Sequence, residues 1–542
     1  MSDVVQIYDT TLRDGSQAED IAFSLEDKLM IAKRLDDFGV DYIEGGWPNP
    51  TNPKDLEFFK RTSKMTFKNA RITSFGSTRR ATNAPEDDAT LNTLLDSGTE
   101  SVCIFGKSWT LHVTDVLKVD LDENVRMIED SVAYLRGRDR EVIYDAEHFF
   151  DGYRANAEYA IRTLKAAEDG GAACVVLCDT NGGTLPLELI QILKDVISQI
   201  NVPFGIHTHN DAGVGVANAI VAVEQGAVQV QGTFNGYGER CGNANLCSII
   251  PNLELKLKKK LKSGENLSEL MDFSRFISEI ANVYHDHRQP YVGESAFAHK
   301  GGVHVDAMNK APTSYEHCAP EQVGNQRRYL LSEQSGTATV AAKLKHLIPG
   351  VDKRDPRVVA LLNLVKQREN QGYIYEGAEA SFDILARKTL QGYDDPFKLI
   401  GFRTINRKTA EGTEVEAIVK LEVNGDLCHT VAEGDGPVNA LDAALRLALE
   451  NEYPVLKSVR LEDYKVRVLS SGDGTAAKVR VLIESSDGQR VWSTIGVSEN
   501  IIDASWLALV DSLTYKLLID GVIGDGTPPP STETASEEKA IV

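Results

Sequence analysis

Val4–Gly15 reads VVQIYDTTLRDG, an apolar run that ends directly in charged residues. The first five residues have the composition of a buried strand, and the turn that follows brings Arg13 and Asp14 side by side before Gly15. A parallel strand that ends in charged side chains is typical of the rim at which α/β barrels carry their active sites. This stretch therefore indicates both the kind of fold and the place of its chemistry.

Short apolar runs alternate with longer amphipathic ones from residue 4 to about residue 262, the pattern of parallel strands joined by helices. We predict eight strands, near residues 4–9, 41–46, 70–76, 101–106, 141–147, 173–178, 203–209 and 228–233. Among the connecting helices we predict Leu25–Phe38, Asp120–Arg136, Tyr153–Glu168 and Leu185–Ile200. Eight strands in about 260 residues match an α/β fold of the (β/α)8 TIM barrel type, and a doubly wound sheet is the alternative.

A second polar strand end follows about two hundred residues later, where Val202–Ile206 leads into HTHND at residues 207–211. Because side chains alternate along a strand, His207 and His209 face the same side. At one barrel rim these two imidazoles would meet the carboxylate of Asp14. Oxygen and nitrogen ligands of this kind suit Mg²⁺, Mn²⁺, Co²⁺ or Zn²⁺, so we predict a site for a divalent metal ion.

The composition excludes several classes of partner. The 542 residues include 80 acidic and 58 basic side chains, a net charge of -22, which argues against nucleic acid and against an anionic membrane as the main partner. No apolar run approaches the roughly 20 residues of a membrane span, and the first residues have no signal-peptide pattern. Seven scattered cysteines form no disulfide framework, so we expect a cytoplasmic protein.

Three motifs carry a resemblance to a known family. DTTLRDG at residues 9–15, HTHND at 207–211 and GERCGN at 238–243 resemble barrel metalloenzymes that include 2-isopropylmalate, homocitrate and (R)-citramalate synthases and, more distantly, hydroxymethylglutaryl-CoA lyase. The resemblance continues through GGVHVD at residues 301–306 into the C-terminal region. The stretch GGWPNPTNPK at residues 45–54 is similar to one subgroup of (R)-citramalate synthases.

The resemblance implies an enzyme and its metal ligands. Asp14, His207 and His209 would bind the metal, Asn243 would be a further ligand or would support one, and Asp14 would also lie in the substrate site. The implied reaction is that of an acyltransferase in isoleucine biosynthesis. It would condense acetyl-CoA with pyruvate and hydrolyse the product to (R)-citramalate and CoA.

The remaining catalytic roles also come from the resemblance. Arg13 would bind the substrate and stabilise the alkoxide that develops during condensation. Thr180 would hydrogen-bond the carboxylate of the oxo acid. A positioned base must remove the methyl proton of acetyl-CoA, and the choice among Glu147, His304 and Tyr315 stays open.

The chain divides by composition into a catalytic barrel, a helical linker region, a regulatory domain and a disordered tail rich in Pro, Ser, Thr and Glu, which we place at residues 1–275, 276–395, 396–524 and 525–542. Helices are predicted in the linker at residues 337–347 and 356–371. Because the linker carries His304 but no barrel strand, it must fold back over a rim. The resemblance implies that it reaches the barrel of a neighbouring subunit in a homodimer.

The last domain contains an internal repeat. Val415–Val423 and Cys428–Glu433 are predicted to form one hairpin and Val479–Glu484 and Arg490–Ile495 a second, each followed by a helix, at residues 438–450 and 501–518. A shift of 61 residues superposes Asn439 on Asn500. We predict a duplicated strand-strand-helix unit, α+β in class, whose halves pack together.

A role for this repeat follows only from the resemblance, which implies an allosteric domain with isoleucine as feedback inhibitor. The turn Gly434–Pro437, at a helix N-terminus, could hold a carboxylate. A purely structural dimerisation domain is the alternative.

Alternatives to (R)-citramalate synthesis stay open. A 2-isopropylmalate synthase would use 2-oxoisovalerate in place of pyruvate, in leucine biosynthesis, and the residues that select the oxo acid cannot be read from the sequence. A metal-dependent acyl-CoA lyase would run the reverse cleavage, which the duplicated domain disfavours. A non-catalytic amino-acid sensor is disfavoured because the polar strand ends needed for chemistry are all present.

Overall fold

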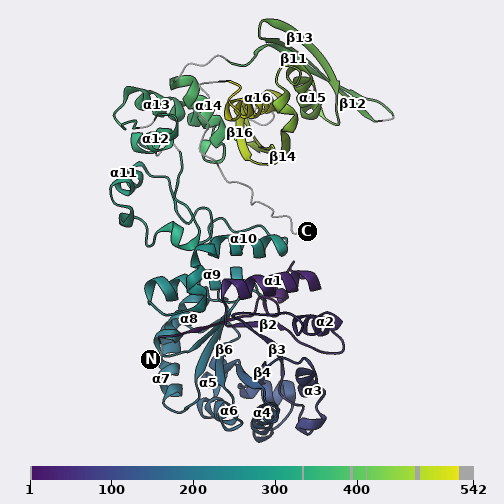
Figure 1. Ribbon diagram of the computed structural model, residues 1–542, viewed down its shortest axis with the longest axis vertical. Coiled ribbons are helices and arrows are strands. Elements are labelled where there is room, and N and C mark those ends of the chain that lie inside the picture. Colours follow the sequence, from purple (N-terminus) through teal and green to yellow (C-terminus); the bar gives the residue numbers. More distant parts are fainter. Residues whose placement is uncertain are drawn as a thin grey trace. The chain divides into compact units, whose positions relative to one another are not determined.

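The protein is described by a computed structural model that covers residues 3–331, 335–348, 350–390, 395–410, 412–469 and 477–523 (Figure 1). It divides into two compact units, Met1–Phe297 with His317–Arg327, and Ala298–Glu316 with Arg328–Val542. The predicted tail, residues 525–542, lies outside the described residues. The division of the chain into four regions stays a prediction. No described helix is both long and apolar enough to cross a membrane.

The first unit is a closed barrel of eight parallel strands in sequential order, β1 to β8. The strands are β1 (Gln6–Asp9), β2 (Tyr42–Gly46), β3 (Arg71–Ser77), β4 (Ser101–Lys107), β5 (Glu141–Glu147), β6 (Cys174–Asp179), β7 (Phe204–Thr208) and β8 (Gln229–Gly232). The barrel closes where β1 pairs with β8, with Gln6 opposite Gln229. All eight predicted strands and the TIM barrel are confirmed.

Helices cover the outside of the barrel. They are α1 (Leu25–Phe38), α2 (Pro53–Thr62), α3 (Ala89–Asp96), α4 (Leu121–Arg136), α5 (Phe149–Ala155), α6 (Ala157–Asp169), α7 (Pro186–Ile197), α8 (Gly215–Glu224), α9 (Leu246–Pro251) and α10 (Leu270–Ile280). The helix predicted at Tyr153–Glu168 is wrong at its start, because Asn156 is extended and its side chain accepts a hydrogen bond from the amide of Tyr159. Asn156 therefore ends α5 and caps α6.

The barrel has an outer and an inner apolar layer. Outward strand residues such as Ile7 and Leu177 pack against the helices in one large core. The inward residues form a smaller cluster made of Tyr8, Tyr42, Phe75, Cys103, Ile143, Cys174, Val176 and Cys178. Because side chains alternate along each strand, polar residues in register with this inner cluster also face the barrel axis. The site described below is built from them.

The first part of the second unit is mainly helical. Its helices are α11 (Gly302–Lys310), α12 (Thr337–Lys343), α13 (Pro356–Asn370) and α14 (Glu379–Leu390), with two short paired strands, β9 (Ala298–His299) and β10 (Arg328–Tyr329). The two helices predicted in the linker are confirmed as α12, which a short 3-10 turn at Leu344–His346 extends, and α13. Asp355 caps α13 by accepting a hydrogen bond from the amide of Arg357, and Pro356 occupies the first helical position.

The C-terminal part contains two three-stranded antiparallel sheets, each followed by a helix. The first is β11 (Lys398–Lys408), β12 (Thr413–Val423) and β13 (Asp426–Glu433) with α15 (Pro437–Leu449), and the second is β14 (Arg460–Val468), β15 (Val479–Ser486) and β16 (Val491–Ser498) with α16 (Ile501–Ile519). Both predicted hairpins and both helices are confirmed. The strands β11 and β14 were not predicted, because most of their side chains are exposed and they lack an apolar alternation.

The two halves repeat each other with an offset of 64 residues. Thr430 Oγ1 donates a hydrogen bond to the carbonyl of Ala444 (2.7 Å), and Thr494 Oγ1 donates one to that of Ala508 (2.8 Å). The predicted offset of 61 residues is therefore wrong for the helices. The two offsets differ by three residues, which is close to one turn of an α-helix. The shorter offset therefore still superposes residues that lie on the same face of the helix.

The packing of the halves on each other is confirmed. Leu445 of α15 and Leu509 of α16 belong to one buried cluster, and the ring of Phe402 stacks on Trp506 with 5.0 Å between centroids.

Candidate active site

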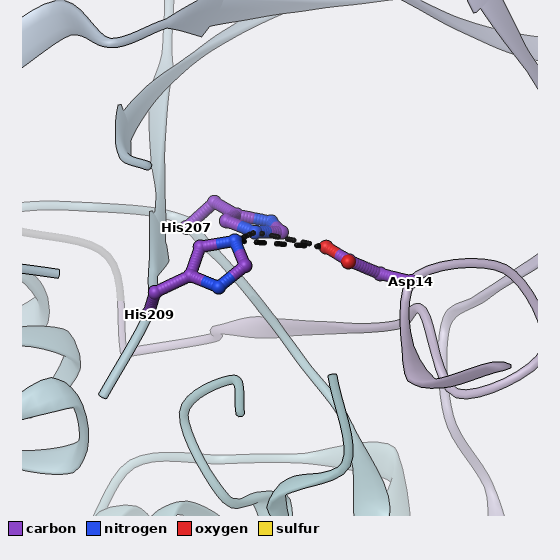
Figure 2. Close-up of side chains that lie close together, drawn as sticks. All are labelled: Asp14, His207 and His209. Carbon is purple, nitrogen blue, oxygen red and sulfur yellow. Dashed lines mark hydrogen bonds and ion pairs between the residues drawn. The ribbon is translucent and has the colours of Figure 1, made fainter. Parts of the chain in front are cut away.

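Three of the predicted metal ligands converge at the C-terminal end of the barrel strands (Figure 2). Asp14 lies in the turn after β1, His207 lies on β7, and His209 follows the last residue of β7. The strand β8 pairs with both β1 and β7, which brings the two strand ends close together. All three residues are at most 5% exposed. They form a buried group that could hold a divalent metal ion.

The geometry of this group fits such an ion. The Nε2 atoms of His207 and His209 lie 3.4 Å apart, and they lie 3.3 and 3.9 Å from Asp14 Oδ2. The point equidistant from the corners of that triangle is about 2.1 Å from each atom, close to the bond lengths of Zn²⁺ and Mg²⁺ to nitrogen and oxygen. One acceptor oxygen and two ring nitrogens thus face a space the size of one cation.

For two of these three residues, the electrostatic surroundings favour the protonation state that can bind a cation. Burial opposes ionisation of Asp14, but Arg13 and His207 hold the pKa of its carboxyl well below the usual range. Burial and the neighbouring ring of His207 lower the pKa of His209 to about 4, so this ring is neutral at pH 7. For His207 burial also lowers the pKa, but the carboxylate of Asp14 outweighs it and the net direction is upward. Asp14 is thus an anion, and His209 offers a lone pair.

Asn243 lies beside this group. Its backbone forms an isolated bridge with His209, and its side-chain amide donates a hydrogen bond to the carbonyl of Tyr237 (3.3 Å). The buried Oδ1 atom of Asn243 has no hydrogen-bond partner among the described residues. A carbonyl oxygen that is buried without a donor is a suitable ligand for a hard cation.

Arg13 is held in place from three sides. Its Nε donates to Glu44 Oε1 (2.5 Å), its Nη1 lies 3.5 Å from Asp14 Oδ2, and the guanidinium carbon is 3.8 Å from the centroid of the Phe75 ring. Burial would lower the pKa of Arg13, but the carboxylates of Glu44 and Asp14 raise it. Glu44 is fully buried in the middle of β2 and also accepts a hydrogen bond from Tyr8 (2.6 Å). The result is a fixed cation beside the metal-ligand group.

A cavity of about 230 Å³ opens onto these side chains. Arg13, Asp14, His207, His209, Glu147 and Thr180 all line it. Glu147 ends β5 and forms an ion pair with Lys107 of β4. The Oγ1 atom of Thr180 accepts a hydrogen bond from the amide of His148 (2.9 Å). The structure therefore brings these six predicted residues together around one cavity.

His304 and Tyr315 belong to the second unit. Their rings stack with 4.1 Å between centroids and an interplanar angle of 27°, and both side chains are exposed. The structure thus joins these two predicted residues to each other. Their role in catalysis stays a prediction.

Several residues of the site were missed. The rings of Trp47, Phe75 and Phe105 contact one another and form an aromatic wall of the cavity. Asp145, two residues before Glu147 on β5, lines the cavity as well, and it accepts a hydrogen bond from Gln231 of β8. Strand alternation puts Asp145 and Glu147 on one face, so the sequence allows Asp145 as well as Glu147 to face the site. Nothing in the sequence connects Asp145 to Gln231.

Comparisons with known proteins agree with this architecture. The family model described as HMGL-like matches residues 4–277. A second model, homocitrate synthase post-HMGL domain-like, matches residues 291–372, and the LeuA allosteric (dimerisation) domain matches residues 376–517.

Relatives match along nearly the whole chain. An (R)-citramalate synthase of Geobacter sulfurreducens is 54% identical, with 95% of this chain and 98% of the relative covered. One of Aquifex aeolicus is 52% identical, with 96% and 99% covered. A 2-isopropylmalate synthase of Methanocaldococcus jannaschii is 29% identical, with 95% of both chains covered. With its barrel matched by the HMGL-like model and two synthases more than half identical to it, the chain belongs to the HMGL-like family, in the branch of the (R)-citramalate synthases.

Proposed function

We propose that this chain condenses acetyl-CoA with pyruvate and releases (R)-citramalate and CoA, as a step of isoleucine biosynthesis. The methyl group of acetyl-CoA loses a proton to a base, and its carbon forms a bond to the ketone carbon of pyruvate. The resulting alkoxide takes up a proton, and water then hydrolyses the thioester. The observation that carries the proposal is the buried Asp14, His207 and His209 group beside Arg13, in a chain so similar to (R)-citramalate synthases.

In this proposal the divalent ion is held by Asp14, His207 and His209, with Asn243 as the further ligand. The donor set does not choose among Mg²⁺, Mn²⁺, Co²⁺ and Zn²⁺, all of which accept oxygen and nitrogen. When bound, the ion supplies Lewis-acid polarisation of the 2-oxo acid. Asp14 would thereby contact both the metal and the substrate.

Arg13 and Thr180 orient the acceptor and respond to its developing charge. Arg13 is a cation in every accessible pH range, and its contacts with Glu44 and Phe75 leave it little freedom. A donor fixed before the reaction stabilises an alkoxide without reorganisation, an effect worth about 10²–10³ in rate. Thr180, whose hydroxyl proton is free to turn toward the cavity, would donate to the carboxylate of the oxo acid. Glu147, His304 and Tyr315 remain the candidates for the base.

The aromatic wall favours pyruvate over 2-oxoisovalerate as the acceptor. Trp47, Phe75 and Phe105 already occupy one side of the cavity, so a methyl group is easier to accommodate than an isopropyl group. Such steric selection is worth about 1–3 kcal/mol for each methylene. This supports (R)-citramalate synthesis over 2-isopropylmalate synthesis.

A thiol-release assay with acetyl-CoA tests the proposal. Metal-free protein is supplied with each of the four divalent ions and with pyruvate, 2-oxobutyrate, 2-oxoisovalerate or 2-oxoglutarate. We expect metal-dependent release of CoA that is fastest with pyruvate. Preference for 2-oxoisovalerate would make the chain a 2-isopropylmalate synthase. No CoA release, together with cleavage of a 3-hydroxyacyl-CoA to acetyl-CoA, would make it a lyase.

The C-terminal repeat supports a proposal of dimerisation and feedback inhibition by isoleucine. The LeuA allosteric (dimerisation) model matches residues 376–517, and the turn Gly434–Pro437 connects β13 to α15. A side chain at Gly434 would meet the backbone nitrogen of Ala440 at 2.5 Å, so Gly434→Val must shift the start of α15. We expect this variant to keep catalysis and to lose inhibition by isoleucine. An unchanged inhibition curve would contradict the proposed place of the effector.

A further inference from the structure

Two buried side chains behind His207 form a hydrogen-bonded chain that the reaction described above does not use. His207 Nδ1 lies 2.8 Å from Gln231 Oε1, and Gln231 Nε2 donates to Asp145 Oδ1 at 2.9 Å. The residues His207, Gln231 and Asp145 are 5%, 1% and 4% exposed. Gln231 is the direct neighbour of His207 across the β7–β8 register. Asp145 lies on β5, three strands away around the barrel, so the second hydrogen bond crosses the barrel interior.

The chemistry of this chain determines which nitrogen of His207 carries a proton. An ionised carboxylate can only accept, so Asp145 requires the NH₂ end of the Gln231 amide to face it. The other end of that amide, Oε1, then faces His207 and requires a proton on Nδ1. The lone pair of a neutral His207 therefore lies on Nε2, the atom that faces Asp14 and His209.

If Gln231 were turned around, its NH₂ group would face Nδ1. The proton of His207 would then move to Nε2, and a protonated nitrogen cannot bind a cation. The other imidazole has no such support, because the buried Nδ1 of His209 has no hydrogen-bond partner among the described residues. The control of the tautomer thus acts on His207.

We propose that Gln231, oriented by Asp145, is a positioning residue that holds His207 in the tautomer competent to bind the metal. This inference rests on the metal-ligand role of His207 in the proposed function. It adds two residues, on two further strands, whose effect on the metal passes through His207.

The first test compares two buried glutamines of the same strand. Gln231 and Gln229 lie two residues apart on β8, face the same side and are each 1% exposed. Titration of the metal-free full-length protein with Co²⁺, followed by visible absorption at pH 8, gives the affinity and the ligand geometry without any turnover. We expect Gln231→Leu to weaken Co²⁺ binding about 10–100-fold, the usual cost of removing the hydrogen-bond partner of a metal-ligating histidine. Gln229→Leu should stay within about twofold of the wild type.

The second test reverses the polarity of the pair. Burial raises the pKa of Asp145 to about 6, so at pH 8 the carboxylate is ionised and accepts only. In Asp145→Asn either orientation of Gln231 is allowed, and Co²⁺ binding should weaken by about threefold to tenfold. The double variant combines Gln231→Glu with Asp145→Asn. The carboxylate at position 231 then accepts a hydrogen bond from His207 Nδ1 and a second one from the amide at position 145. Binding should return to within about threefold of the wild type.

Each outcome has one meaning. Unchanged Co²⁺ affinity in Gln231→Leu overturns the proposal, and so does a double variant as weak as Gln231→Leu. If Gln231→Leu fails to fold, as judged by its thermal unfolding, the double variant decides, because it keeps both polar groups. A wild-type protein that binds no Co²⁺ would instead contradict the metal site of the proposed function.

Discussion

The predicted catalytic residues lie in two regions that differ in how they are held. In the barrel, Asp14 and His207 are buried, with 3.3 Å between Asp14 Oδ2 and His207 Nε2, and His207 also contacts Gln231 of the neighbouring strand β8. In the second unit, His304 and Tyr315 stack on each other at the surface, and Tyr315 is 45% exposed. The barrel group is thus preorganised by the fold, whereas the second pair is open to solvent.

The largest loss of activity is expected when a proposed metal ligand in the barrel is replaced. We expect His207→Ala to lower kcat/KM for acetyl-CoA and pyruvate by about 10³-fold or more, because Lewis-acid stabilisation of several kcal/mol is lost. Co²⁺ binding should be lost in the same variant. His285→Ala, which removes a histidine hydrogen-bonded to Ser274, is the matched control and should keep both properties. A His207→Ala enzyme with substantial activity would show that the barrel group is not the centre of the reaction.

The next largest effect concerns the fixed cation. Arg13→Ala should lower kcat by about 10²–10³-fold, since the donor aimed at the developing alkoxide is removed. The affinity for Co²⁺ should change much less, because Arg13 is not a ligand. Arg162→Ala removes an exposed arginine paired with Asp122 and should have no measurable effect on steady-state kinetics. Equal effects of the two substitutions would contradict the role of Arg13.

The stacked pair His304 and Tyr315 can be tested for a role in catalysis separately from metal binding. His304→Ala should lower kcat by about 10²-fold, as expected for a general acid or base, and should leave Co²⁺ affinity unchanged. If the pair completes the site of a neighbouring subunit, His304→Ala and Arg13→Ala chains complement each other. After random mixing of equal amounts, about a quarter of the wild-type activity should return, because half of the dimers are mixed and each has one intact site. No recovery would mean that each site is built from one chain.

The smallest effect separates acceptor choice from catalysis. Phe105→Ala opens the aromatic wall and should raise the ratio of kcat/KM for 2-oxoisovalerate to that for pyruvate by about tenfold. His304→Ala should leave this ratio unchanged, even though it lowers both rates. The thiol-release assay with the two oxo acids measures both variants. A shift of the ratio in His304→Ala would show that the second unit also selects the acceptor.

Much of the fold and of the site can be predicted from local patterns. The eight barrel strands and the convergence of Asp14, His207 and His209 follow from apolar runs, strand alternation and the common rim of a parallel barrel. These features depend on neighbouring residues in the chain and on a regular topology. The roles of Arg13, Thr180 and Asn243 come from family resemblance and stay predictions until they are tested.

The features that were missed have three different physical causes. The hydrogen bond from Gln231 to Asp145 joins residues 86 positions apart and exists only because the barrel closes. The strand β11 was missed because its side chains are mostly exposed, so its burial gives no period of two. The helix break at Asn156 has a local signal, since asparagine is among the residues preferred at a helix N-cap, where its side chain here accepts from the amide of Tyr159.

The tandem repeat has a consequence for how the C-terminal domain comes apart. Leu445 and Leu509 come from different halves yet share one apolar interior, so opening either half exposes the other to water. The halves should therefore melt as one cooperative transition, and their slowest-exchanging amides should share a single opening free energy. A domain that opens in one step has a closed state and an open state, without populated intermediates. A small molecule that binds only the closed state therefore shifts the equilibrium toward that state.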